Sequence, residues 1–92
     1  MNEKLIERKL KTGVEKLGGL ALKLVCLSFT GIPDRTVLMP GGKVWFAELK
    51  TTGKKPSPRQ VIVIAFLRKL GFSVYVIDTE RQLDDFLKNI QK

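Results

Sequence analysis

The sequence predicts one α/β domain in which a central mixed sheet is flanked by helices, with the element order α-β-β-β-α-β-α. Three observations support this fold class. Apolar residues recur at helical spacing near both ends of the chain, two strand-like segments flank a glycine-rich turn, and a helix-start signal comes before a β-branched segment. The chain has 92 residues, which fits a single domain over residues 1–92 with one modest core.

The first helix is predicted over residues 3–17. Its apolar residues recur at helical spacing and form one stripe, which consists of Ile6, Leu10, Val14 and Leu17. The glycine pair at 18–19 ends this helix. Residues 20–27 are rich in hydrophobes, with Lys23 as the main interruption, and are predicted to form a buried strand that carries Cys26 into the core.

Residues 36–39 and 43–49 flank a Pro-Gly-Gly turn, which is the strongest hairpin signal in the chain. Both faces of the hairpin carry hydrophobes, so we expect helices to cover the sheet on both sides. The middle of the second strand holds Trp45 and Phe46, which we expect to lie in the core.

The register of this hairpin depends on the turn. A turn centred on Gly41 sets Asp34 directly opposite Glu48. A two-residue loop at 41–42 shifts the pairing by one residue and sets Asp34 against Leu49 instead.

Residues 51–58 are predicted to form a basic, flexible loop that ends in the start of a second helix. Ser57 suits the N-cap, Pro58 the first helical position and Gln60 the other half of a capping box. This helix is expected to continue through Leu70.

The chain is predicted to finish with one more strand and one more helix. Residues 72–78 are β-branched and aromatic, as is typical of a strand. Thr79 can then cap a last amphipathic helix, whose apolar residues are Leu83, Phe86, Leu87 and Ile90.

The composition narrows the possible functions. Seventeen Lys and Arg residues against nine acids give a net charge of +8, which favours a polyanionic partner. The chain has no histidine and a single cysteine, which excludes histidine-based catalysis, an intrachain disulfide and a multi-cysteine zinc site. No segment is apolar over the roughly 20 residues of a membrane span and no signal peptide is visible, so we expect no membrane association and a cytoplasmic location.

Two acids and a lysine stand out at the ends of the hairpin strands. Glu48 and Lys50 must point to the same face of their strand, and Asp34 can lie opposite Glu48. Two neighbouring carboxylates repel each other unless a cation lies between them, and their hard oxygen atoms suit Mg²⁺ or Mn²⁺. The alternative is that Lys50 simply neutralises one of the acids at a strand end.

These residues resemble a known family. The Pro-Asp pair at 33–34 and the Glu-Leu-Lys sequence at 48–50 resemble the PD-(D/E)XK nuclease superfamily, which has a restriction-endonuclease-like fold. Within that superfamily, GIPDR at 31–35, ELK at 48–50 and PRQ at 58–60 resemble the VRR-NUC domain, in a stand-alone form of the kind that phages carry. The resemblance covers about residues 3 to 79.

The resemblance implies a divalent-metal-dependent endonuclease that hydrolyses DNA. Some stand-alone members cut four-way (Holliday) junctions as homodimers. By analogy, Asp34 and Glu48 would bind Mg²⁺ or Mn²⁺ together with the backbone carbonyl of Leu49. Lys50 would orient or activate the attacking water and steady the phosphate, and Gln60 would support the site. Gln60 needs no function beyond closing a capping box, but the two roles need not exclude each other.

The resemblance also implies a role for Glu7, which would approach the metal through water. Helix geometry permits this, because Glu7 lies roughly 20° from Val14 on the helical wheel and so reaches the edge of the apolar stripe. Glu3 is a weaker candidate for this role because it lies near the end of the helix. Alternatively, Glu7 is an exposed partner of nearby basic residues, namely Lys4, Arg8 and Lys11.

Five basic residues near the proposed site are candidates for binding the nucleic-acid backbone: Lys23, Arg35, Lys54, Lys55 and Arg59. Two other function classes stay open. One is a non-catalytic nucleic-acid-binding module with the same fold, and the other is a small partner protein whose acids and lysines are merely paired. RNA as a substrate also stays open.

A single site in so small a domain would need a two-fold dimer to cut both strands of a branched substrate. Two helices are candidates for such an interface. They are the last helix, with Phe86 and Leu87, and the helix after Pro58, with Ile62, Phe66 and Leu67, although all of these residues could equally belong to the core.

Overall fold

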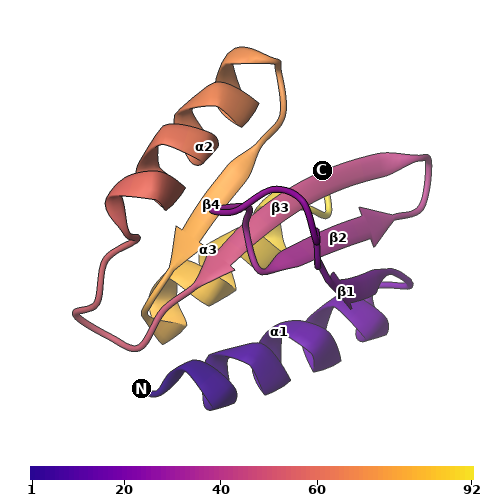
Figure 1. Cartoon of the computed structure of the whole chain (residues 1–92). Coiled ribbons are helices and arrows are strands. Elements are labelled where there is room, and N and C mark those ends of the chain that lie inside the picture. Colours follow the sequence, from indigo (N-terminus) through magenta and orange to yellow (C-terminus); the bar gives the residue numbers. More distant parts are fainter.

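The computed structural model describes residues 1–92, and its centre is a four-stranded mixed sheet with the strand order β1-β2-β3-β4. The strands are β1 (Leu20–Lys23), β2 (Arg35–Met39), β3 (Lys43–Leu49) and β4 (Val74–Ile77). The first three strands are antiparallel neighbours, whereas β4 runs parallel to β3 because the helix α2 (Pro58–Lys69) connects them (Figure 1). The predicted element order and the mixed sheet are therefore confirmed.

Two helices, α1 (Glu3–Lys16) and α3 (Glu80–Asn89), pack side by side against one face of the sheet (Figure 1). The predicted stripe of α1 points into this layer, where Ile6, Leu10 and Val14 are fully buried. From α3, Leu83 and Phe86 reach the same core. The hydrophobic core of the protein thus lies between these two helices and one side of the sheet.

The opposite face of the sheet is less completely covered. Helix α2 lies along β4, and the segment between β1 and β2 crosses in front of the sheet (Figure 1). Side chains on this side of the first three strands stay accessible, with Leu22 at 46% and Val44 at 39% exposure. The predicted cover by helices is therefore complete on one face of the sheet and partial on the other.

The predicted buried strand over residues 20–27 is wrong in both length and burial. Strand β1 ends at Lys23 and forms an edge of the sheet, so only one neighbour shields it. After the last link to β2, from the Leu24 N–H to the Asp34 carbonyl, the chain leaves the sheet, and Cys26 is exposed rather than in the core. An apolar run in the sequence does not reveal whether its strand lies in the middle or at the edge of a sheet.

The hairpin register is the one set by a turn centred on Gly41. Thr36 faces Phe46 in the ladder, and the turn contains Gly41 and Gly42 with φ angles of 86° and 74°, which are accessible to glycine. Trp45 packs against the core as predicted. Phe46, on the other face, is half-buried and contacts Phe72 edge to face, with 5.5 Å between ring centroids.

No helix in the structure combines the length and the apolar character that crossing a bilayer requires.

Candidate active site

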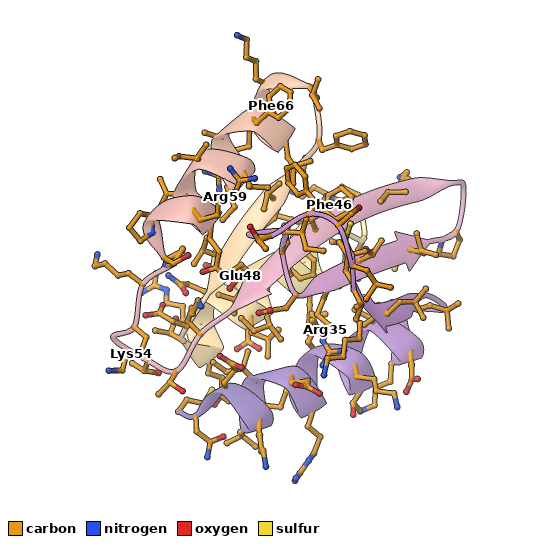
Figure 2. All side chains as sticks on the ribbon, viewed as in Figure 1. Arg35, Phe46, Glu48, Lys54, Arg59 and Phe66 are labelled. Atoms are coloured by element: carbon orange, nitrogen blue, oxygen red, sulfur yellow. The ribbon has the colours of Figure 1, made fainter.

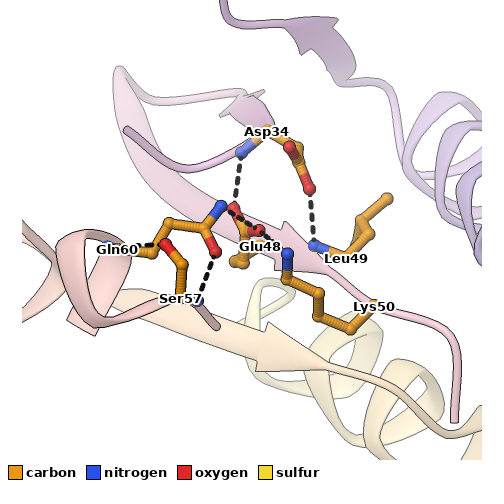
Figure 3. A network of polar contacts seen from close by, with 6 residues as sticks. All are labelled: Asp34, Glu48, Leu49, Lys50, Ser57 and Gln60. Atoms are coloured by element: carbon orange, nitrogen blue, oxygen red, sulfur yellow. Dashed lines mark hydrogen bonds and ion pairs between the residues drawn. The ribbon is translucent and has the colours of Figure 1, made fainter. Parts of the chain in front are cut away.

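Asp34 and Glu48 are held by a reciprocal pair of hydrogen bonds at the ends of β2 and β3 (Figure 3). The Asp34 N–H donates to Oε1 of Glu48 at 3.2 Å, and the Leu49 N–H donates to Oδ2 of Asp34 at 3.0 Å. The buried Pro33 fixes an extended approach to this position. Each side chain therefore binds the other strand's backbone, which fixes the place of both carboxylates.

Glu48 is completely buried, and its other oxygen atom, Oε2, has two partners. The Gln60 side-chain amide donates to it at 2.6 Å, and the Lys50 Nζ lies 3.1 Å away. Burial raises the pKa of the Glu48 carboxyl above its usual value, the hydrogen bond from Lys50 lowers it, and the charge of Asp34 raises it again. The net effect is a raised pKa, and burial is its largest cause.

Gln60 links the start of α2 to this carboxylate. Its Oε1 accepts from the Ser57 N–H at 2.9 Å, and Ser57 Oγ accepts from the Gln60 N–H at 3.2 Å, which completes the predicted capping box. With Oε1 occupied by a donor, the NH₂ group of Gln60 must point the other way, toward Glu48 (Figure 3). The capping role and a contact with Glu48, which the sequence analysis treated as compatible, therefore coexist in one side chain.

Glu7 reaches the edge of the sheet as the helical wheel predicts, but its partner is a residue that the sequence did not suggest. The carboxylate of Glu7 forms an ion pair with Arg35 of β2 rather than with its neighbours in α1. Both residues line a small cavity of about 160 Å³ together with Asp34 and Lys23. The structure thus brings Glu7 and the exposed Lys23 to the border of the Asp34 site.

The structure corrects the prediction that Arg35 binds the nucleic-acid backbone. Only 9% of the residue is exposed, and its guanidinium forms an ion pair with the carboxylate of Glu7. A buried and paired arginine presents little surface to a phosphate, so Arg35 serves inside the protein as the counter-charge of Glu7. The burial of Arg35 could have been inferred from the sequence, because side chains alternate between the faces of a strand and Arg35 lies on the same face of β2 as the buried Val37.

The other basic candidates lie at the surface. Lys54 and Lys55 are exposed in the loop between β3 and α2 (Figure 2). This loop is fastened by Asp78, whose carboxylate accepts from the Gly53 N–H at 3.0 Å, a contact that no sequence pattern indicated. Arg59 is held by the Thr30 carbonyl at 3.3 Å and lies over the ring of Phe29, so it is partly occupied within the protein.

The donor set near Asp34 and Glu48 fits a hard divalent cation. No three carboxylate, cysteine or histidine side chains lie close enough together to hold a metal by side chains alone. Magnesium commonly binds through one or two carboxylates and keeps several water ligands. Two fixed carboxylates, one of them buried with a raised pKa, are consistent with that mode of binding.

Comparisons with known proteins agree with this arrangement. No protein-family model matches the chain. The p44 protein of Acyrthosiphon pisum secondary endosymbiont phage 1, whose name describes it as a predicted nuclease, is 42% identical over 80 residues, which cover 87% of this chain and 86% of p44. A solved structure described as a VRR_NUC domain superposes with a TM-score of 0.87 at 34% identity and covers 94% of both chains. The chain therefore belongs to the VRR-NUC family of phage-type nucleases.

Proposed function

We propose that this protein is a divalent-metal-dependent endonuclease that hydrolyses phosphodiester bonds in DNA. The observation that carries the proposal is the buried Glu48, which is fixed by the Asp34 backbone, Gln60 and Lys50 at the end of the hairpin. A purely structural ion pair at a strand end would not need a second carboxylate beside it. The VRR_NUC fold and the p44 relative support nuclease activity.

Asp34 and Glu48 would hold Mg²⁺ or Mn²⁺, with the Leu49 carbonyl as a further oxygen ligand. Such an ion would polarise the phosphate and lower the pKa of a bound water. Glu7 lines the neighbouring cavity, from which its carboxylate could hold a water ligand in place. Arg35 keeps the Glu7 carboxylate in this position.

The remaining residues of the site would position groups and offset charge. Lys50, whose side chain is 22% exposed, can approach a phosphate while it stays next to Glu48, and its ammonium group would offset negative charge in the transition state. Gln60 would keep Oε2 of Glu48 directed into the site. The exposed Lys23, Lys54 and Lys55 would hold the DNA backbone without reading the sequence.

The substrate we propose is branched DNA, with a four-way junction as the leading candidate, cut by a homodimer. No recognition-helix or zinc-module motif is visible in the sequence, so selectivity for DNA shape is the more suitable expectation. One site per chain cuts one strand, and two symmetric cuts call for a two-fold pair.

The test uses labelled four-way-junction, flap and linear duplex DNA with Mg²⁺, Mn²⁺ or a chelator. Wild type is compared with Asp34→Ala, Lys50→Ala and the control Asp84→Ala, which removes an exposed acid of α3. We expect metal-dependent cuts that are lost in the first two variants and kept in the control. Symmetric cuts confined to the junction would support the resolvase-like activity. Salt-dependent DNA binding without cleavage in either metal would refute the enzyme and favour a binding module.

A further inference from the structure

Helix α1 carries lysines whose expected partner is engaged elsewhere. In the sequence, Lys4 and Lys11 are neighbours that could neutralise Glu7 on the same helix. In the structure, the Glu7 carboxylate pairs with Arg35 of β2 instead. The structure has three ion pairs, and neither lysine takes part in any of them. Both side chains are exposed, so α1 presents two cations without an acidic partner.

The two lysines lie on the side of α1 that borders the proposed active site. They are seven residues apart, which is nearly two helical turns, so their directions differ by roughly 20° and they lie about 10 Å apart along the helix axis. Glu7 lies between them in the chain, roughly 40° from Lys11 and 60° from Lys4 on the helical wheel. Because Glu7 faces Arg35 at the edge of the site, the two lysines flank the same edge.

Two small cavities lie in a row between Asp34 and Lys11. The first, of about 160 Å³, is lined by Asp34 and Lys23 together with Glu7 and Arg35. The second, of about 170 Å³, is lined by Lys11 and again by Glu7 and Arg35. Since the two cavities share the pair of Glu7 and Arg35, they are neighbours on one surface. This surface leads from the Asp34 side chain to Lys11.

The start of α1 also lies beside the basic loop that follows β3 (Figure 1). Two hydrogen bonds tie them together. The Thr52 N–H donates to the Met1 carbonyl at 3.0 Å, and the Glu3 N–H donates to Thr51 Oγ1 at 3.2 Å. Lys4 directly follows Glu3, so along the helix it lies between this loop and the two cavities.

The opposite side of α1 is different, because its cations face acids. Arg8, Lys9 and Lys16 line a cavity of about 360 Å³ together with Glu80 and Asp84 of α3. The Lys9 ammonium group pairs with the Glu80 carboxylate at 3.1 Å. A surface on which the charges balance has little attraction for a polyanion.

The site side of α1 lacks such compensation. Glu7 is occupied by its partner on β2, and the exposed Glu3 at the rim of the first cavity forms no ion pair. No acid therefore neutralises Lys4, Lys11 or Lys23. Binding of the nucleic-acid backbone depends on cations that are free to meet phosphates, and these three lysines meet that condition.

We propose that Lys4 and Lys11 of α1 bind phosphates of the nucleic-acid backbone next to the proposed cut site. Together with Lys23 of β1 and the lysines of the loop at 51–58, they form one continuous basic border along the Asp34 side of the site. The backbone that leaves the site then runs along α1, without any reading of the bases. The inference rests on the proposed function for the position of the cut, whereas the binding of phosphates needs no catalysis.

The first test measures DNA affinity in the presence of a chelator, so that no metal-dependent cleavage takes place. A labelled four-way junction is titrated with protein over a range of salt concentrations, and fluorescence anisotropy reports binding. The variant Lys4→Gln/Lys11→Gln should bind about 10-fold more weakly than wild type at about 0.1 M salt. The slope of log affinity against log salt should become less steep by about 1.8, since each lost phosphate contact removes about 0.9.

The matched control is Lys16→Gln/Lys88→Gln. It lowers the net charge by the same amount, at exposed positions in the last turns of α1 and α3. Its affinity should stay within about two-fold of wild type, and its salt slope should be unchanged. Lys4→Arg/Lys11→Arg keeps both charges and should bind as wild type does. Circular dichroism and thermal unfolding check that all the variants stay folded.

A second test locates the contacts on the DNA. Single phosphates on the arms of the junction are replaced by uncharged methylphosphonates, and the affinity is measured again in chelator. At the phosphates that α1 binds, the replacement should weaken wild type but should have little effect on Lys4→Gln/Lys11→Gln, because that contact is already lost. Equal effects on wild type and this variant at every position would overturn the inference.

The outcomes separate this inference from the nuclease proposal. Equal losses in the two Gln variants would mean that only net charge matters, and an unchanged salt slope in Lys4→Gln/Lys11→Gln would mean that α1 contacts no phosphate. Either result overturns the basic border, and so does a wild type that binds no DNA in chelator. A protein that binds DNA through α1 but cuts no substrate in either metal would keep the border and refute the enzyme.

Discussion

The two faces of the sheet differ in what their side chains do. On the face under α1 and α3, apolar residues such as Ile6 and Phe86 are fully buried. On the face toward α2, the buried residue at the end of β3 is the charged Glu48, and large apolar residues such as Phe66 stay exposed. The first face supplies most of the burial that stabilises the fold. The second face is left free for chemistry and for contacts with other molecules.

The largest change in stability is expected on the face of the sheet that α1 and α3 cover. Phe86→Ala should lower the free energy of unfolding by about 3–5 kcal/mol, because Phe86 is fully buried and contacts Tyr75 edge to face. Val61→Ala, at an exposed position of α2, should change the free energy of unfolding by no more than about 0.5 kcal/mol. Urea titrations of both variants provide the measurement. Equal losses would mean that the two faces stabilise the fold to a similar degree.

The next prediction compares an acid in the site with one outside it. Glu48→Gln should lower the metal-dependent cleavage rate at least about 100-fold, because it would remove the charge that we propose holds the cation. Glu80→Gln is the control. It removes the exposed partner of Lys9 on α3, and the rate should stay within about two-fold of wild type. The measurement is the single-turnover cleavage rate of each variant on one DNA substrate. If Glu48→Gln cleaves at the wild-type rate, Glu48 is not a metal ligand.

A smaller effect is expected at the link between Ser57 and Gln60. Gln60→Ala should lower the cleavage rate by about 10–100-fold, since the group that directs Glu48 is lost. Ser57→Ala should lower the free energy of unfolding by about 1 kcal/mol through loss of the helix cap. Ser57→Asp should restore the cap and the stability. If Gln60→Ala changes stability but leaves the rate and the metal dependence unchanged, Gln60 acts only as a cap.

The smallest expected effect is a pH dependence of stability in the chelated protein. The pKa of Glu48 is raised in the folded state, so the folded protein binds this proton more tightly than the unfolded chain does. Its contribution is therefore fully present below the usual glutamate pKa and is lost as the pH rises through the raised value. Thermal unfolding of wild type and Glu48→Gln across this acidic range should show a steeper decline for wild type. Parallel curves would contradict the raised pKa.

The capping box illustrates what could be predicted locally. Ser57, Pro58 and Gln60 lie within four positions, so their hydrogen bonds depend on one helical turn and not on the rest of the chain. The glycines at 41–42 limited the hairpin register to two alternatives, and the observed pairing of β2 with β3 is the one that a turn centred on Gly41 sets. The approach of Asp34 to Glu48 follows directly from that register.

Other features depend on which elements pack together. The exposure of β1 and Cys26 follows from the position of that strand at the sheet edge, which its composition does not encode. The pairing of Glu7 with Arg35 requires α1 to pack against the sheet, and the fastening of the loop by Asp78 requires the end of β4 to lie beside that loop. These contacts join residues that are far apart in the chain.

The sequence by itself determined the order of the elements, two possible registers of the hairpin and the residues that can form the site, because helical periodicity, turn chemistry and capping act over a few neighbouring positions. The tertiary structure alone decided which apolar residues are covered. Ile62 and Phe86 look equally suited to a core in the sequence, yet one is 62% exposed and the other is fully buried. Burial is set by the helices that pack on each face, and here two helices cover one face and a single helix covers part of the other.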